Sequence, residues 1–377
     1  MVEQTATKLH YDIVGSFLRP AQLKEAREKF VAGQIDQSAL TAVENSEIKK
    51  LVAQEIAAGL QVVTDGEFRR SYWHLDTFWG FAGIEHTRPE HGYFFHDEET
   101  RADSARVVGK IAFKPSHPDI QAFKFLQELV ADQPGVTARQ SIPAPAQFYS
   151  ELLRGEDNLA ALQQVYPDQA ELITDIGQAY HDLILTLYQA GCRDLKIDDC
   201  TWGMVVDHDF WENQTNGDYD LEELQDIYLQ VNNAALSDLP ADLRLSTHVC
   251  RGNYHSTWAA SGGYAPVASH LLAQEKVDAF YLEFDDDRSG DFEPLAEVPA
   301  GKKVVLGLVT SKKAQLEQPE TLIARIKEAA QEVPLENLSL STQCGFASTE
   351  EGNKLTEDQQ WDKIRLVVAT AKEVWGE

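Results

Sequence analysis

Four side chains that commonly bind zinc occur in the second half of the sequence, each at the end of a strand-like segment. His248 and Cys250 are two residues apart, so in a strand they point to the same face and can reach one ion. Glu283 and Cys344 follow two later strand-like segments. One histidine, two cysteines and one glutamate are a plausible tetrahedral set for Zn²⁺. A strand-end cysteine is more often a small buried residue than a ligand, so the spacing alone leaves both interpretations open.

The elements that would position these side chains alternate along the chain. Amphipathic helical patterns, such as those of residues 44–58, 170–190 and 357–374, alternate with short apolar segments. This alternation predicts a parallel sheet, and eight units predict a closed (β/α)8 barrel, a TIM barrel, whose active site is built at the C-terminal ends of its strands. The eight predicted strands are residues 10–15, 61–65, 137–142, 193–198, 243–249, 278–284, 303–309 and 337–343.

One long insertion separates the second and third predicted strands. Residues 80–115 are rich in glycine, histidine and aromatic residues and contain the strand-like segment 106–111. We expect a hairpin that lies over one mouth of the barrel. The chain has no low-complexity linker, so we expect one catalytic barrel over residues 1–377.

Composition excludes several classes of function. The net charge of −28 repels phosphate backbones and anionic membranes, which argues against a nucleic-acid or membrane partner. The N-terminal residues lack the pattern of a secretory signal, and no apolar run is long enough to span a membrane. The four cysteines contain no C-x-x-C pair. We therefore expect a cytoplasmic protein whose cysteines are free thiols or metal ligands.

Three further polar residues lie at predicted strand ends and could bind a substrate. They are Ser16, Glu67 and Asp198. Each has an ordinary structural alternative. Glu67 could form a salt bridge with Arg69 or Arg70, and Asp198 could cap a helix N-terminus.

Together these segments resemble the C-terminal catalytic barrel of the cobalamin-independent methionine synthases, from about residue 10 to residue 375. The order and spacing of the matching motifs carry the resemblance. They are Gly15-Ser16-Phe17, Asp65-Gly66-Glu67, Ile197-Asp198-Asp199, His248-Val249-Cys250, Glu283 and Cys344-Gly345. The match is closest to a short branch of the family that has the catalytic barrel only.

The resemblance implies a zinc-dependent methyltransferase that converts homocysteine to methionine, with methyltetrahydrofolate or another compound as donor. His248, Cys250, Glu283 and Cys344 would be the zinc ligands. Glu67 and Asp198 would bind the ammonium of the amino acid, and the backbone around Ser16 its carboxylate.

The sequence also departs from the family pattern. Asp65 replaces a histidine, Cys200 replaces a proline, and the segment 307–312 lacks a histidine that acts as a proton donor in larger members. Lys312 and His255 are candidates for that role.

Other functions remain open from the sequence. The barrel could alkylate a different thiol, accept a methyl group from a corrinoid protein or a sulfonium compound, or bind a thiol through zinc without turnover. A metal-free aldolase would need a lysine at a strand end, and Lys196 is the clear candidate. We expect strand alternation to direct Lys196 away from the inner face near Asp198. The sequence leaves open whether the protein is a homo-oligomer.

Overall fold

The protein has a mixed α/β fold in which a seven-stranded parallel sheet curls into a barrel. The computed structural model describes residues 9–207 and 220–377. Along the sheet the strands follow in the order β1-β4-β5-β6-β7-β8-β9, and every neighbouring pair is parallel. Their bounds are β1 Val62–Val63, β4 Thr137–Pro143, β5 Asp194–Asp199, β6 Arg244–Val249, β7 Ala279–Glu283, β8 Lys303–Val309 and β9 Leu338–Thr342.

Residues 10–15, the first predicted strand, fill the gap between β9 and β1. Tyr11 forms a parallel bridge with Leu340, and Asp12 N donates to the Leu340 carbonyl at 2.9 Å. On the other side, Thr64 Oγ1 donates to the Gly15 carbonyl at 2.6 Å. The segment therefore takes the eighth position without forming a regular strand. The prediction of a (β/α)8 barrel is confirmed, and the predicted strand bounds are close to those observed.

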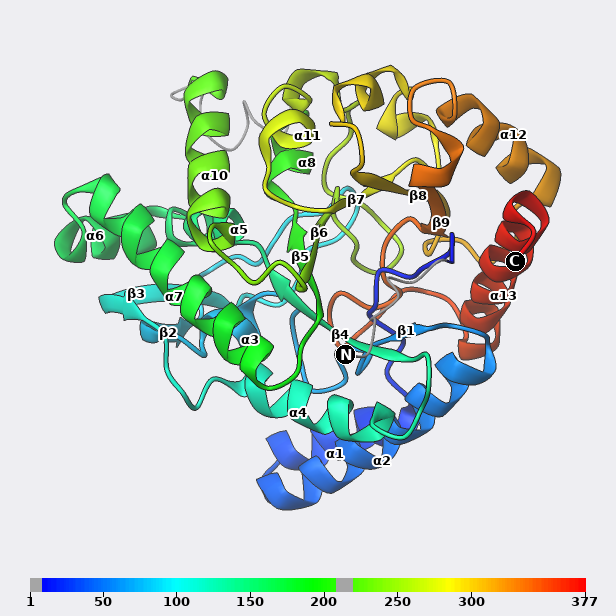
Figure 1. Ribbon diagram of the computed structural model, residues 1–377. Coiled ribbons are helices and arrows are strands. Elements are labelled where there is room, and N and C mark those ends of the chain that lie inside the picture. The colour runs from blue at the N-terminus through cyan, green and yellow to red at the C-terminus, as the bar shows by residue number, and fades with distance from the viewer. Residues whose placement is uncertain (1–8, 208–219) are drawn as a thin grey trace.

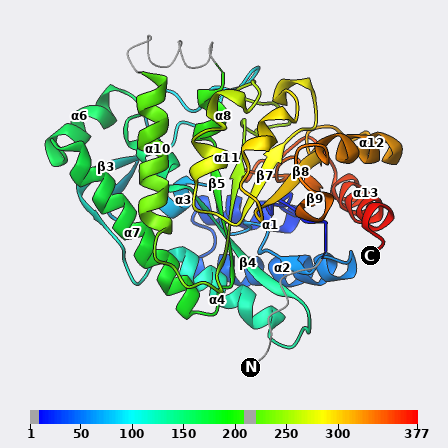
Figure 2. The same cartoon turned by 45° about the horizontal axis from the view of Figure 1, so that its top comes forward.

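Helices form an outer ring around the sheet (Figures 1 and 2). Most strands are followed by a helix that packs its apolar face on the barrel, as α13 does with Ile364, Val367 and Ala371. Between β7 and β8 the described chain has only short 3-10 helices, of which η3 is Glu293–Glu297. The α-helices are α1 Ala21–Val31, α2 Gln37–Ala57, α3 Leu75–Phe78, α4 Pro118–Val130, α5 Pro145–Leu152, α6 Glu156–Val165, α7 Gln169–Gln189, α8 Thr201–Val205, α10 Leu221–Leu236, α11 Leu271–Gln274, α12 Pro319–Ala329 and α13 Glu357–Trp375. None of these described helices is long and apolar enough to cross a membrane.

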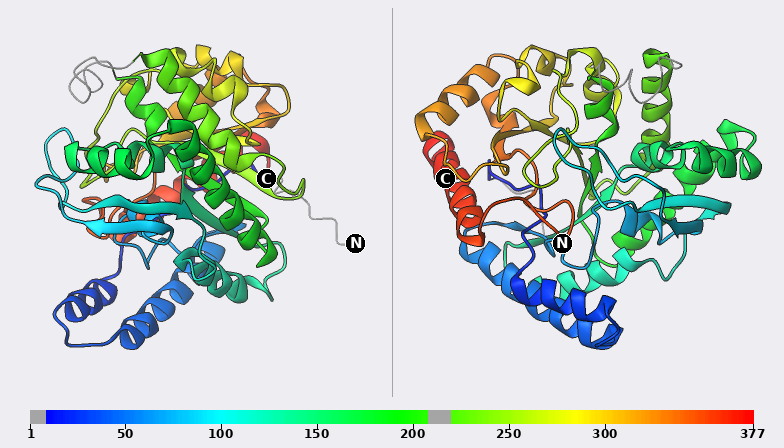
Figure 3. Two further views of the ribbon diagram at one scale, coloured as in Figure 1. Left: turned by 90° about the vertical axis from the view of Figure 1, so that its left-hand side faces the viewer. Right: turned by 180° about the vertical axis from the view of Figure 1, so that it is seen from behind.

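The insertion after β1 is an antiparallel hairpin of β2 (Ala82–Thr87) and β3 (Ser104–Ala112). Its strands lie to one side of the barrel, where β3 packs against α6 and α7 (Figure 3). The expectation that the hairpin lies over the mouth is therefore wrong for its strands, because β3 buries Ala105 and Val107 against helices. The connection between the strands does reach the loop after β6, because Glu98 pairs with His255 and His96 N donates to the Trp258 carbonyl at 2.8 Å. Glu98 also pairs with Lys354, in the segment between β9 and α13.

Charged residues fill the barrel interior below the strand ends. Arg139 on β4 is fully buried and pairs with Asp12 at 2.9 Å and with Asp194 at 2.6 Å. The Tyr281 hydroxyl donates to the same Asp12 oxygen, Oδ2, at 2.6 Å. A buried arginine between two carboxylates is a compensated arrangement, because each charge has hydrogen-bonded partners of opposite sign. We call these four residues, Arg139, Asp12, Asp194 and Tyr281, the floor network.

Candidate active site

The four candidate zinc ligands lie together at one rim of the barrel. The ligand atoms of His248, Cys250, Glu283 and Cys344 are all within 4.8 Å of one another, and all four residues are buried. The two sulfur atoms are 3.6 Å apart. His248 and Glu283 stand at the ends of β6 and β7, while Cys250 and Cys344 follow β6 and β9. The structure therefore brings together residues that are up to 96 positions apart in the chain.

The environment of the cluster fits a metal ion. The Nδ1 atom of His248 lies 3.3 Å from the Tyr281 carbonyl, while Nε2 is buried without a hydrogen-bond partner. Glu283 likewise has one buried oxygen, Oε2, without a partner. Hydrogen bonding between neighbouring thiols, together with burial, raises the pKa of both Cys250 and Cys344 well above its usual value. A nitrogen and an oxygen without hydrogen-bond partners converge here with two neighbouring sulfur atoms, and this is a donor set suited to Zn²⁺.

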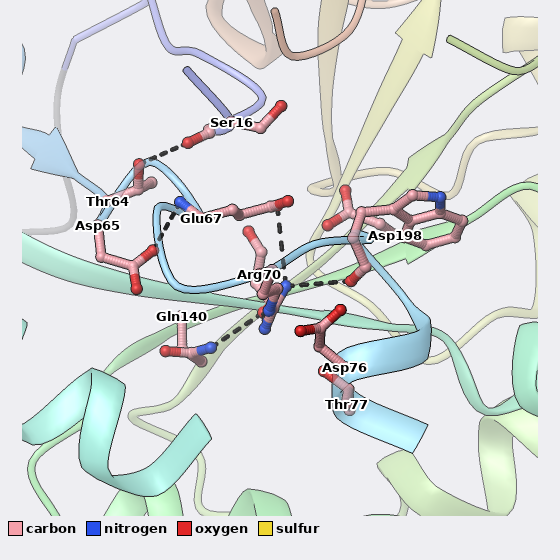
Figure 4. A network of polar contacts seen from close by, with 12 residues as sticks. Ser16, Thr64, Asp65, Glu67, Arg70, Asp76, Thr77, Gln140 and Asp198 are labelled. Carbon is pink, nitrogen blue, oxygen red and sulfur yellow. Dashed lines mark hydrogen bonds and ion pairs between the residues drawn. The ribbon is translucent and has the colours of Figure 1, made fainter. Parts of the chain in front are cut away.

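Glu67 and Asp198 form a second group beside this cluster. Figure 4 shows the Glu67 side chain extending from the loop after β1 toward Asp198 on β5. Glu67 has a positive φ of 60° and follows Gly66, where a Cβ would lie 2.4 Å from Leu51 Cδ2. Such a backbone is strained for glutamate, and strained residues often lie at functional sites. Burial is the main cause that raises the pKa of Glu67 to about 7; Arg70 opposes the shift and Asp198 adds to it.

Of the two structural roles that the sequence also allowed, the salt bridge of Glu67 is present but long, and the helix cap by Asp198 is absent. Arg70 Nη1 lies 3.8 Å from Glu67, so the predicted salt bridge is present but long, and the Oε2 atom of Glu67 has no hydrogen-bond partner. Arg70 donates instead to Asp119 at 3.0 Å and to the Ser141 carbonyl at 2.6 Å. Asp198 does not cap a helix. Its neighbour Asp199 accepts from Thr201 N at 2.9 Å, while Asp198 Oδ1 is buried without a hydrogen-bond partner.

Ser16 joins the opening segment to the loop that carries Cys344. Its hydroxyl accepts a hydrogen bond from Ala347 N at 3.3 Å, and its carbonyl accepts from Phe346 N at 2.9 Å. Sequence analysis missed Arg19, which is buried and donates to five backbone carbonyls at 2.7–3.4 Å, those of Phe17, Gly66, Glu67, Arg70 and Ala347. A single guanidinium thus fixes the backbone of three loops, and no local sequence pattern indicates this.

Lys196 faces the barrel interior, contrary to our expectation. Its Nζ atom lies 3.7 Å from Asp198 Oδ1, and the residue is fully buried. The physical reason is the two-residue period of a strand, which places residues 196 and 198 on the same face. That spacing was visible in the sequence and should have been interpreted as a shared inner face.

Three other polar residues near the site were not assigned a firm role from the sequence. Cys200 lies close enough to Cys250 for a hydrogen bond between the thiols to affect the pKa of both. Lys312, after β8, is buried and its Nζ has no hydrogen-bond partner; its charge acts on Asp285, which follows Glu283 by two residues. His255 is paired with Glu98.

Comparisons with known proteins point to the same family. Residues 147–373 match the family model described as "Cobalamin-independent synthase, Catalytic domain". The uncharacterized proteins YxjH and YxjG of Bacillus subtilis are 44% and 40% identical over 99% and 97% of this chain and over 96% and 94% of their own lengths. A 5-methyltetrahydropteroyltriglutamate–homocysteine methyltransferase of Thermosynechococcus vestitus is 21% identical over 92% of this chain, which spans 41% of that protein.

Solved structures show the same fold. A putative vitamin-B12-independent methionine synthase from Listeria monocytogenes is 34% identical and superimposes with a TM-score of 0.75 over 98% of both chains. A B12-independent methionine synthase from Shewanella, solved in complex with selenomethionine, has a TM-score of 0.71 at 17% identity and 97% coverage of both chains.

Proposed function

This chain belongs to the family of cobalamin-independent synthase catalytic domains, and on that premise we propose that it methylates the thiol of homocysteine to form methionine. The observation that carries the proposal is the cluster of two thiols, one imidazole and one carboxylate at the barrel rim, with ligand atoms within 4.8 Å of one another. A thiol must lose its proton before it can attack a methyl group, because the thiolate is the nucleophile.

We assign this cluster as a zinc site held by His248, Cys250, Glu283 and Cys344. Bound zinc would lower the pKa of a thiol that it coordinates, so that the acceptor sulfur is deprotonated at neutral pH. Two cysteinates and a glutamate outweigh the charge of Zn²⁺, which would keep the acceptor sulfur electron-rich. His248 is oriented for this role, because the contact of its Nδ1 with the Tyr281 carbonyl leaves Nε2 for the ion.

The residues beside the zinc site would bind the amino-acid end of the acceptor. Glu67 and Asp198 each have a buried oxygen without a hydrogen-bond partner, and both would accept hydrogen bonds from an ammonium group. The backbone at Ser16 would lie near the carboxylate. Arg69 and Arg70 are engaged with Glu44, Asn45 and Asp119, so we do not assign either of them to a carboxylate of the donor.

We propose methyltetrahydrofolate as the first donor to test, because the family relative from Thermosynechococcus carries a methyltetrahydropteroyl donor in its name. That protein is more than twice as long as this chain, so a donor that needs only one barrel, such as a corrinoid or sulfonium compound, is the second choice. Lys312 is a candidate for protonating the departing group, since its ammonium is buried without a hydrogen-bond acceptor.

Metal content tests the site directly. We expect about one zinc per chain in the purified wild type and a loss of zinc in Cys250→Ser and Cys344→Ser, because each removes a thiolate ligand. Cys192→Ser is the matched control: this buried thiol donates to the Asp194 carbonyl, below the site, and its loss should leave zinc content unchanged. Equal zinc in all four proteins would remove the proposed metal centre.

Product formation tests the reaction. Zinc-loaded protein is incubated with homocysteine and, in separate reactions, methyltetrahydrofolate, a methylcorrinoid protein and a methylsulfonium compound, and methionine is measured. Methionine from any of these donors supports the proposal and identifies the donor class. Zinc and thiol binding without methionine from any donor would instead indicate a thiol-binding protein.

A further inference from the structure

Four polar atoms near the amino-acid site are buried and have no hydrogen-bond partner. They are Glu67 Oε2, Asp198 Oδ1, Lys196 Nζ and Ser141 Oγ, and each residue is at least nine-tenths buried. We call these four residues the polar cluster. Buried polar groups are nearly always hydrogen-bonded, so four such atoms in one region point to a ligand or to solvent that satisfies them.

The polar cluster is contiguous. Ser141 on β4 stands opposite Lys196 on β5 in the sheet register. A Cβ placed on Gly15 would lie 3.7 Å from Lys196 Nζ and 3.8 Å from Ser141 Oγ, so both groups border the backbone next to Ser16. On the other side, Lys196 Nζ lies 3.7 Å from Asp198 Oδ1, too far for a hydrogen bond but close enough for attraction. The ammonium of Lys196 thus lies between Asp198 and the Gly15-Ser16 backbone.

The floor network does not satisfy Lys196. The carboxylates of Asp12 and Asp194 are both bound by Arg139, and the Tyr281 hydroxyl donates to Asp12. The ring of Tyr281, with its centroid 5.5 Å from Nζ, offers only a weak cation–π contact. An ammonium without an acceptor destabilises the ligand-free fold, and an incoming carboxylate would remove that penalty.

The chemistry of the cluster is complementary to a zwitterion. Two carboxylate oxygens lack a donor, while an ammonium and a hydroxyl lack an acceptor. An α-amino acid supplies an ammonium and a carboxylate on one carbon atom. We propose that Lys196, assisted by Ser141, binds the carboxylate of the amino-acid acceptor, while Glu67 and Asp198 bind its ammonium. This assignment rests on the proposed function and makes Lys196 the residue that distinguishes amino acids from simple amines.

The test compares methionine with 3-methylthiopropylamine, which is methionine without its carboxylate. Dissociation constants for both are measured by calorimetry. The dissociation constant of the amine divided by that of methionine is the ratio that reports what the carboxylate contributes. We expect Lys196→Met to lower this ratio roughly ten- to hundredfold, the worth of one charge-assisted hydrogen bond, while amine binding changes little. Lys303→Met, at the opposite end of the barrel on β8, should leave the ratio unchanged.

Ser141→Ala removes one hydroxyl and gives an independent measurement that does not depend on burying a new side chain. We expect the ratio to fall by about fivefold. If thermal melting shows that Lys196→Met does not fold, the ratio measured for Ser141→Ala decides whether the polar cluster binds the carboxylate. If the ratio is unchanged in every folded variant, or if both ligands bind more weakly by the same factor, Lys196 does not bind the carboxylate. Either result leaves the proposed reaction intact. Failure of wild-type protein to bind methionine would reject both.

Discussion

The hydroxyl of Ser16 and the α-carbon of Gly345 are in such close contact that a Cβ on Gly345 would lie 1.9 Å from Ser16 Oγ and 3.0 Å from Ser16 Cβ. Gly345 follows the candidate zinc ligand Cys344, and Asn253 holds its carbonyl at 2.8 Å. The backbone that would receive the acceptor's carboxylate is therefore packed directly on the loop that carries a metal ligand.

Gly345→Ala should disturb both halves of the site. The new methyl group must displace Ser16 or the Cys344 loop, and a shift of about 1 Å can reduce the rate of an enzyme about a hundredfold. We expect kcat/KM for homocysteine to fall by that order and zinc affinity to weaken, measured by steady-state assay and by competition with a chelator. Gly109→Ala, whose methyl would meet only Gly83 Cα at 3.7 Å, is the control. Wild-type values in Gly345→Ala would contradict the coupling.

Binding of the amino acid should depend on the ionisation of Glu67. The pKa of Glu67 is raised to about 7 in the ligand-free protein, and the ionised form binds an ammonium. Affinity for methionine should therefore rise about tenfold per pH unit below pH 7 and level off above it. Titration calorimetry between pH 5.5 and pH 8 measures this (about 2.5 pH units, across the shifted pKa).

Glu67→Gln should bind methionine weakly and lose this pH dependence, because the amide does not titrate. A wild-type affinity that stays flat from acid to neutral pH would show that Glu67 does not contact the ammonium in its ionised form.

Arg19 should be a major source of stability. Its guanidinium donates to five backbone carbonyls, and Arg19→Met would remove a donor from each of them. We expect the free energy of unfolding to drop by about 3 kcal/mol or more, measured by denaturant titration. Arg88→Ala is the control, because that side chain is 81% exposed. A drop no larger than in the control would mean that the carbonyls find other donors.

Glu275 should make stability depend on pH. Burial raises the pKa of this carboxyl to about 8, with the charge of Asp199 as the next cause. The folded state thus retains a proton that the unfolded state loses near its ordinary pKa. The contribution of Glu275 is fully present below that ordinary value and is lost as pH rises toward 8.

Glu275→Gln removes this titration and can still accept the hydrogen bond from Asn232. We expect the difference between its melting temperature and that of the wild type to increase by several degrees in favour of the variant between pH 5 and pH 8. A constant difference across that range would contradict the raised pKa.

The fold and the metal cluster could be predicted from the sequence because each depends on short-range periodicity. The predicted strand of residues 243–249, which carries His248, and the predicted helix of residues 357–374 lie within one residue of the observed β6 and α13. Once eight units close into a barrel, their strand ends must meet, so residues as distant as Cys250 and Cys344 converge.

The polar interior of the barrel was harder to predict. Arg139, Asp12 and Asp194 lie in different units, and nothing in one local segment indicates which charges pair across the barrel. The position of the hairpin strands depended on packing against α6 and α7, which are also distant in sequence. The single-domain organisation, the cytoplasmic location and the roles of individual site residues remain predictions.

The donor atoms of the metal cluster reach one place only when β6, β7 and the loop after β9 have assembled. In the unfolded chain they would be dispersed, so a cation that binds them selects the closed barrel. Occupancy and folding would then be linked by mass action, each tenfold excess of free metal over its dissociation constant adding about 1.4 kcal/mol. When metal is scarce, this protein would therefore have a shorter lifetime in the cell as well as a lower reaction rate.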